Sequence, residues 1–206
     1  MPILLQRVAG LLGSLATLPM LVGIVTAVRI DSPGPGFHGA RRVGGGGQLF
    51  TCYKIRTMYI AFDGSGPAVT TSEDGRVTRV GRLLRRYRLD EIPQLWNVAR
   101  GEMLLVGPRP EDPRFVDLAT PLQRQVFTAI PGITGLTQLA FVDEAAMIDT
   151  RDPERHYREV ILPRKLALDA DYLRRRSLRL DLWILGQTIL TALGRRTPIE
   201  AIEARR

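Results

Sequence analysis

The sequence contains little of the chemistry that many enzymes use. It has one cysteine, Cys52, and two histidines, His38 and His156, among 206 residues. A single cysteine excludes an internal disulfide and a zinc site built from cysteines, so a reducing compartment is favoured. Two histidines are too few for a histidine-rich metal cluster. The glycines at 44–47 lack the Gly-Lys-Ser/Thr ending of a phosphate-binding P-loop, and a hairpin turn is predicted there instead.

Charge is absent from residues 8–28, between Arg7 and Arg29. A helix of that length measures roughly 30 Å, which is enough to cross a bilayer. Pro19 near its middle removes a helical hydrogen bond, and this favours a hairpin broken near Pro19 that enters and leaves the membrane on one face. A kinked spanning helix and a signal peptide are the alternatives, and the run is longer than a signal-peptide core. Basic residues at both flanks favour the cytoplasmic side for both ends.

Positive charge is in excess, with 29 Lys and Arg against 21 Asp and Glu and a formal net charge of +8. Such a surface favours anionic partners, which include nucleic acid, acidic lipid headgroups and phosphorylated substrates. The length supports one domain at 30–206 attached to a membrane segment at 1–29. We predict an α+β fold, a mostly helical compact domain with short β-hairpin elements, plus the N-terminal re-entrant membrane helix and amphipathic membrane-surface helices.

Periodicity and turn residues place the elements along the chain. Apolar alternation predicts strands around a glycine turn at 42–50 and onward through 50–58, and apolar segments predict further short strands at 102–106 and within 131–138. Helical spacing predicts a basic amphipathic helix at 77–87. Two more helices are predicted at 153–177 and 178–193, and the polar, glycine-rich segment 63–75 is predicted as a surface loop.

Several cations are candidates for binding an anion. Lys54 and Arg56 fall on one face of a predicted strand, where a solvated edge strand is the alternative. Arg109 lies between Pro108 and Pro110, and this rigid bend would hold its guanidinium in a direction suited to bidentate phosphate recognition.

The adjacent carboxylates Asp90 and Glu91 are the strongest candidates for chemistry. They follow an arginine-rich segment and precede Pro93. Consecutive helical residues do not share a face, so two different tasks are easier to assign than a shared proton. One carboxylate could attack phosphorus, and the other could hold a divalent metal that neutralises a diphosphate. By itself, however, the pair favours an ordinary helix start with a capping aspartate.

The order of short motifs changes that interpretation. The chain resembles, over nearly its whole length, the bacterial sugar transferase family, the monotopic polyprenyl-phosphate phosphoglycosyl transferases. The motifs that carry the resemblance are an apolar N-terminal segment with a central proline, Asp31-Ser32-Pro33-Gly34-Pro35, Arg42-Val43-Gly44, Tyr53-Lys54-Ile55-Arg56-Thr57-Met58, Leu89-Asp90-Glu91-Ile92-Pro93-Gln94-Leu95-Trp96-Asn97-Val98, Val106-Gly107-Pro108-Arg109-Pro110 and Pro131-Gly132-Ile133-Thr134-Gly135.

The resemblance implies transfer of sugar-1-phosphate from a UDP-sugar to undecaprenyl phosphate, with release of UMP. It implies that Asp90 attacks the β-phosphorus and that Glu91 ligates Mg²⁺. The residues that it implies for substrate binding are Lys54, Arg56, Arg85, Gly107, Pro108, Arg109 and Pro110.

The same resemblance implies a location at the cytoplasmic face of the bacterial inner (plasma) membrane. The expected partners are the UDP-sugar, undecaprenyl phosphate and membrane lipids, with no nucleic acid. Leu18, Arg88 and Thr137 depart from the usual family pattern, and Arg88 adds positive charge beside Asp90. The competing hypothesis is a non-catalytic membrane-anchored basic module that binds anionic lipid or nucleic acid.

Overall fold

The computed structural model describes residues 1–60 and 68–195. The fold is α+β, as predicted, with helices around short strands. The predicted loop at 63–75 falls partly outside the described residues. The elements are α1 (Ile3–Asp31), β1 (Phe37–Val43), η1 (Gly45–Gly47), β2 (Leu49–Ile55), α2 (Arg79–Arg86), η2 (Leu89–Glu91), α3 (Gln94–Arg100), β3 (Leu104–Val106), η3 (Pro113–Phe115), α4 (Pro121–Phe127), β4 (Gly132–Thr134), α5 (Leu136–Ala140), α6 (Glu144–Met147), α7 (Pro153–His156), the π-helical turn η4 (Tyr157–Ile161), α8 (Leu162–Arg175) and α9 (Leu178–Ala192).

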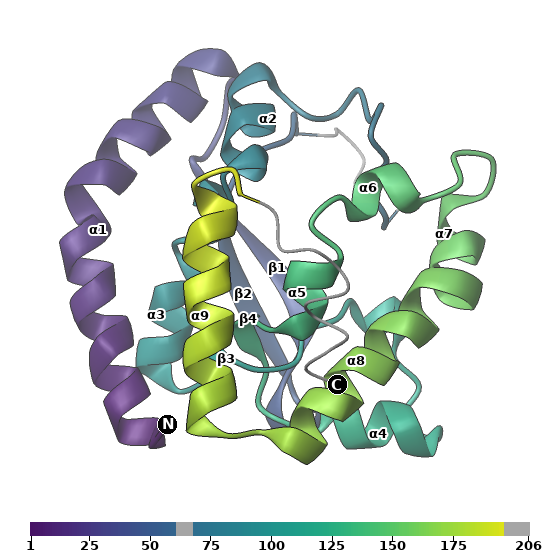
Figure 1. The fold of residues 1–206 in the computed structure, drawn as a ribbon. Helices are drawn as coiled ribbons and strands as arrows, with labels where there is room; N and C mark the ends of the chain where they lie inside the picture. Colours follow the sequence, from purple (N-terminus) through teal and green to yellow (C-terminus); the bar gives the residue numbers. More distant parts are fainter. Residues whose placement is uncertain (61–67, 196–206) are drawn as a thin grey trace.

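Helix α1 corrects the prediction of a helix broken near Pro19. It is continuous from Ile3 to Asp31 with Pro19 inside it, and Figure 1 shows it as a bowed ribbon along one side of the molecule. A proline removes one backbone donor, and a bend can accommodate that loss without ending the helix. The hydroxyls of Ser14 and Thr17 donate to the carbonyls of Gly10, Gly13 and Ser14 at 2.8–3.2 Å. Helix α1 is also long and apolar enough to cross a membrane.

The N-terminal half of α1 packs against α3 and β3. A Cβ atom on Gly10 would lie 2.8 Å from the Ala99 backbone nitrogen, so only glycine allows this approach of the two helices. The side chain of Arg7 donates to the Ala99 carbonyl at 3.1 Å, and the buried Gln6 side chain accepts from the Leu105 amide at 2.9 Å. These polar contacts fix the start of α1 on the domain.

The C-terminal half of α1 packs against α2. Buried Val28, with Ile24 and Val25 beside it, packs with Leu84 and Val80 of α2 in one apolar cluster. The carboxylate of Asp31 accepts from the Val80 amide at 3.0 Å, at the start of α2. Both ends of α1 are therefore bonded to the same globular part.

The strands form two small sheets. Strands β1 and β2 pair antiparallel as a hairpin, with Val43 opposite Leu49, and the glycine turn between them is as predicted. Gly46 and Gly47 have φ values of 68° and 74°, a conformation that favours glycine. Strands β3 and β4 pair parallel, which confirms short strands at both predicted segments.

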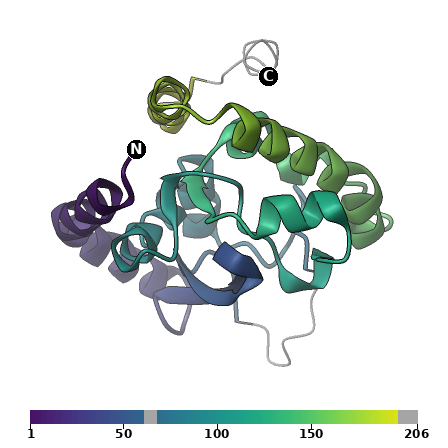
Figure 2. The ribbon, with the colours of Figure 1, turned by 90° about the horizontal axis from the view of Figure 1, so that it is seen from below.

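Helices α8 and α9 confirm the two helices predicted near the C-terminus. They contribute Leu162, Leu166, Tyr172, Leu180 and Ile184 to the largest apolar core. Figure 2 shows these helices and the β1–β2 hairpin on opposite sides of the molecule, with α1 along one flank.

Candidate active site

A large cavity of about 1150 Å³ lies between the hairpin, α2, α5 and α8. Its volume exceeds the about 300–1,000 Å³ that is typical of a site for one small ligand. Among the described residues that line it, eleven are Lys or Arg and six are Asp or Glu. The wall therefore has the charge expected for a polyanionic ligand.

The carboxylates Asp90 and Glu91 lie in the wall of this cavity. They belong to the turn η2, which follows Arg88, whose φ of 54° is unusual for a residue other than glycine. The sequence left open an ordinary helix start at this pair, but α3 begins only at Gln94 and has no side-chain cap. The pair therefore does not cap α3.

Glu91 is surrounded by three cations. Its Oε1 atom lies 3.0 Å from Lys54 Nζ and 3.7 Å from Arg109 Nη1, and its Oε2 atom lies 3.3 Å from Arg88 Nη1. Burial opposes ionisation of Glu91, but the three positive charges outweigh it and hold the pKa of this carboxyl well below its ordinary value. Glu91 is therefore a fixed anion.

Asp90 has a different environment, although it is the next residue in the chain. Its side chain forms no ion pair with any other residue of the described part of the chain. Burial and the neighbouring negative charge of Glu91 raise the pKa of Asp90 above its ordinary value. Asp90 is thus the carboxylate that is not neutralised by a bonded cation. The two carboxylates therefore differ in their electrostatic environment, and the separate tasks expected of them stay a prediction.

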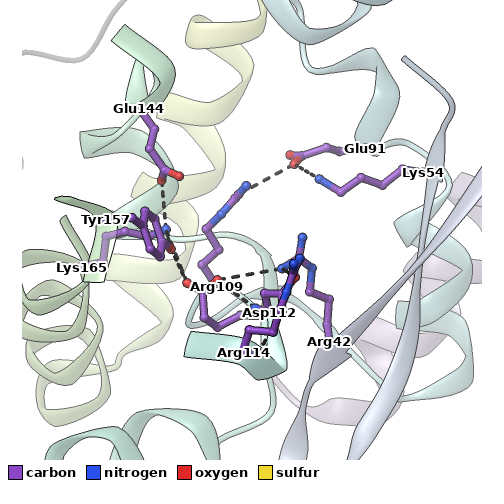
Figure 3. Close-up of polar contacts among 10 residues, drawn as sticks. Arg42, Lys54, Glu91, Arg109, Asp112, Arg114, Glu144, Tyr157 and Lys165 are labelled. Carbon is purple, nitrogen blue, oxygen red and sulfur yellow. Dashed lines mark hydrogen bonds and ion pairs between the residues drawn. The ribbon is translucent and has the colours of Figure 1, made fainter. Parts of the chain in front are cut away.

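Arg109 reaches Glu91 from the turn after β3. Figure 3 shows its guanidinium directed at Glu91. The Arg109 amide donates to Asp169 of α8 at 3.2 Å, and Asp169 accepts from the Thr137 hydroxyl at 2.5 Å. Burial raises the pKa of Asp169 to about 7. The base of the Arg109 side chain is thereby attached to α8 and α5.

A second group of charges also lines the cavity, on the other side of Arg109 from Glu91, and we call it the rear network: Glu111, Glu144, Tyr157 and Lys165. The Tyr157 hydroxyl donates to Glu111 at 2.5 Å, and Lys165 Nζ donates to the Tyr157 hydroxyl at 2.5 Å and to Glu144 at 2.9 Å. Lys165 also lies 3.6 Å from Glu111. Glu111 follows Pro110 directly, so the rear network fixes the end of the Pro-Arg-Pro turn, and the bond to Asp169 fixes Arg109 in its middle.

The other predicted binding residues divide into two groups. Arg85 and Pro110 line the cavity, and Arg85 donates to the Thr57 hydroxyl at 2.8 Å. Gly107 and Pro108 instead contact β4, where the Gly107 amide donates to the Thr134 carbonyl and the Pro108 carbonyl accepts from the Gly132 amide. These bonds place the turn that carries Arg109, and the predicted contact of Gly107 and Pro108 with substrate stays a prediction.

Arg56 lines the cavity, but the structure gives its guanidinium another set of contacts. It donates to both oxygens of Ser32 at 2.6 and 2.8 Å, to the Pro35 carbonyl at 2.6 Å and to the Met58 carbonyl at 3.2 Å. These bonds hold the chain where it leaves α1. The predicted contact of Arg56 with substrate stays a prediction.

Sequence reasoning missed Tyr157, Lys165 and Asp169. Lys165 and Asp169 are four residues apart and are buried on the same side of α8 as Leu162 and Leu166. A pair of opposite charges within the apolar spacing of a helix is the signal that could have identified them. Tyr157 carries no comparable signal, because its partners come from distant segments.

The donor set fits a metal that needs few protein ligands. Within residues 1–60 and 68–195, no group of three or more His, Cys, Asp or Glu side chains is placed to hold a metal ion. Mg²⁺ is commonly held by one or two carboxylates together with waters and substrate phosphates, and Asp90 and Glu91 offer such carboxylates in the cavity wall. A closed structural metal site does not fit these residues.

Comparison with known proteins gives matches over most of the chain. The family described as bacterial sugar transferase matches residues 3–195. A UDP-glucose:undecaprenyl-phosphate glucose-1-phosphate transferase of Caulobacter vibrioides is 37% identical over 92% of this chain and 68% of its own length. A UDP-N-acetylgalactosamine-undecaprenyl-phosphate N-acetylgalactosaminephosphotransferase of Aeromonas hydrophila is 35% identical over 85% of this chain, which spans only 39% of that relative. The exopolysaccharide production protein ExoY of Sinorhizobium fredii is 34% identical over 87% of this chain and 80% of its own length.

Proposed function

The chain belongs to the bacterial sugar transferase family, and we propose that it transfers a sugar-1-phosphate from a UDP-sugar to undecaprenyl phosphate, as a membrane step of surface glycan assembly. The Caulobacter and Aeromonas relatives are both named for undecaprenyl phosphate, whereas their named sugars differ. The proposal therefore names the acceptor and the class of donor. The positively charged cavity wall supports a nucleotide diphosphate donor.

The contrast between Asp90 and Glu91 carries the mechanism. Asp90 lies in the cavity wall without a bonded cation, whereas Glu91 is paired with Lys54, Arg88 and Arg109. In the first displacement, an Asp90 carboxylate oxygen bonds to the β-phosphorus of the UDP-sugar as the bond from that phosphorus to UMP breaks. UMP leaves with the bridging oxygen, and the sugar phosphate stays on Asp90.

The second displacement regenerates the enzyme. An oxygen of the lipid phosphate bonds to the same phosphorus while the bond from phosphorus to Asp90 breaks, which frees the carboxylate and forms the lipid-linked diphosphate sugar. Lys54, Arg85 and Arg109 provide positive charge for the phosphoryl groups in both displacements. One cavity can serve both steps because the soluble and the lipid substrate react in turn.

Glu91 is the residue that we propose as a ligand of Mg²⁺. When bound, Mg²⁺ would neutralise part of the charge of the diphosphate. Glu91 stays ionised because its pKa is lowered by the three neighbouring cations, and an ionised carboxylate is the form that binds a metal.

The packing of α1 supports a membrane segment that enters and leaves on one face. Arg7 near its start is bonded to Ala99, and Asp31 at its end is bonded to Val80. A straight membrane span would carry these two ends to opposite sides of the bilayer. Arg7 and Arg29 flank the apolar run and favour the cytoplasmic face of the bacterial plasma membrane.

The decisive experiment detects the covalent intermediate. Wild-type protein incubated with UDP-sugar and Mg²⁺, without lipid acceptor, should release UMP and gain the mass of one phosphosugar. Asp90→Asn should show neither result. Asp112→Asn makes the same change at another carboxylate of the cavity wall and should still form the adduct.

Two outcomes would contradict the mechanism. An adduct that survives Asp90→Asn would remove Asp90 as the nucleophile. Wild-type protein that binds anionic vesicles but releases no UMP with any UDP-sugar of a panel would favour the non-catalytic basic module.

A further inference from the structure

Two cations of the cavity wall lack the partners that the others have. Among the described residues, nine of the eleven Lys and Arg side chains that line the cavity donate to, or pair with, an oxygen of the protein. The side chains of Arg41 and Arg86 make no hydrogen bond or ion pair with another residue of that part of the chain. An unpaired guanidinium in the wall of a site is available to a ligand anion.

Arg86 is the one of these two that lies on α2, beside the apolar helix α1. Val80 and Leu84 of α2 pack against Ile24, Val25 and Val28 in the C-terminal half of α1. Figure 1 shows α2 next to the end of α1 from which the chain continues into the domain. A ligand that reaches the cavity from the membrane along this half of α1 would therefore meet α2.

Exposed apolar side chains occur in two places, beside Arg86 on α2, where its guanidinium lies 5.8 Å from the centroid of the Tyr87 ring, and in the cavity wall. Tyr59 and Ile60 line the same cavity and are 50% and 54% exposed. Leu83 and Tyr87, which lie three residues before and one residue after Arg86 on α2, are 55% and 36% exposed. We call Tyr59, Ile60, Leu83 and Tyr87 the apolar rim. A phosphate attached to a long hydrocarbon chain needs an apolar surface and a cation together.

We propose that Arg86 and the apolar rim bind the lipid acceptor, with the Arg86 guanidinium on its phosphate and its first isoprene units against the rim. This assignment rests on the proposed function and deepens it. Arg86 lies four residues before Asp90, and both line the cavity. The lipid phosphate is thereby held on the membrane side of the phosphosugar that it must attack. Arg86 acts in the second displacement and not in the first.

Measuring the two half-reactions separately distinguishes a specific contact of Arg86 with the lipid phosphate from a general effect of positive charge on both substrates. Arg86→Gln should form the Asp90 adduct and release UMP at the wild-type rate, because the UDP-sugar does not use Arg86. Its KM for undecaprenyl phosphate should rise about tenfold, as expected for the loss of one charge-assisted hydrogen bond. Arg86→Lys should recover part of the affinity. The assay uses neutral detergent micelles without anionic phospholipid, so that attraction to a charged bilayer does not contribute.

Arg79→Gln is the matched control. Arg79 is an exposed arginine at the start of the same helix, and it is not among the residues that line the cavity. It should keep the wild-type KM for both substrates. The thermal unfolding midpoint of each variant checks that the fold is intact.

Three results would overturn the assignment. Equal increases of the lipid KM in Arg86→Gln and Arg79→Gln would show that the overall charge of α2 is responsible. An increase of the KM for UDP-sugar, or slower adduct formation, in Arg86→Gln would place Arg86 at the donor. If inorganic phosphate inhibited the second half-reaction as strongly as a short-chain isoprenyl phosphate does, the apolar rim would not contribute to binding of the lipid. Wild-type protein without any adduct would instead contradict the proposed function itself.

Discussion

The charges on the two sides of Arg109 are arranged in different ways. On one side, Lys54, Arg88 and Arg109 surround Glu91 at 3.0–3.7 Å, and the side chains of these cations remain partly exposed. On the other side, the rear network joins Glu111, Tyr157 and Lys165 through contacts of 2.5 Å, and all three residues are buried. Figure 3 shows Arg109 between the two groups.

This difference indicates which charges can be exchanged with a ligand. Ion pairs that are partly open to water contribute little to stability, so a substrate phosphate or a metal can replace one partner at small cost. Buried charges that lose a partner are strongly destabilising. We therefore expect substitutions near Glu91 to impair activity and substitutions in the rear network to impair folding.

Lys165→Met should give the largest effect and should act on stability. It removes the cation that Glu111 and Glu144 share and leaves Glu111 buried with less compensation. The free energy of unfolding should fall by about 3 kcal/mol, measured by chemical denaturation in detergent. Arg164→Met removes an exposed cation from the same helix and should change stability by less than about 0.5 kcal/mol. Equal stabilities of the two variants would show that the rear network is not a fixed support.

Lys54→Met should impair activity and leave stability nearly unchanged, the opposite of Lys165→Met. Arg88 and Arg109 remain beside Glu91, so the free energy of unfolding should change by less than about 1 kcal/mol. The rate of adduct formation from UDP-sugar should fall about a hundredfold, because a cation that stabilises the phosphoryl group is lost. Lys54→Arg keeps the charge and should retain more of the rate. If Lys54→Met were destabilised but formed the adduct at the normal rate, Lys54 would support the fold and not the reaction, which would contradict the comparison with the rear network.

How much of this arrangement the sequence could predict depends on how local each feature is. The hairpin and the bend around Arg109 follow from short segments, and the structure places them, with Asp90 and Glu91, in one cavity wall or beside it. The division of tasks between the two carboxylates stays a prediction. Arg56 shows the limit of strand alternation, because its guanidinium turns to Ser32 and Pro35 at the end of α1. Helix α1 is unbroken, and the bonds that hold it to the domain lie near its two ends, at Arg7 and Asp31, which no local pattern around Pro19 contains.

Asp169→Asn tests the attachment of Arg109 to α8 and should give the smallest effect. In the folded protein the pKa of Asp169 is raised to about 7, whereas an unfolded aspartate titrates near about 3.9. Thr137, Lys165 and the Arg109 amide face this carboxyl, and the cations Lys165 and Arg109 only partly offset its burial. Between these two pKa values the folded state binds more protons than the unfolded state, so the contribution of Asp169 to stability is lost as pH rises from about 4 to about 7.

The asparagine variant removes this pH dependence while keeping the shape of the side chain. Its carbonyl oxygen can accept from the Arg109 amide, and its amide can donate to the Thr137 hydroxyl, which also bonds the Lys165 carbonyl. From pH 5 to pH 7, wild-type protein should lose about 2 kcal/mol of unfolding free energy relative to Asp169→Asn. Exposed Asp117 is the control, and Asp117→Asn should keep the wild-type slope. Parallel curves for wild type and Asp169→Asn would show that Asp169 is ionised throughout this range, and that an ionised carboxylate holds the Arg109 amide.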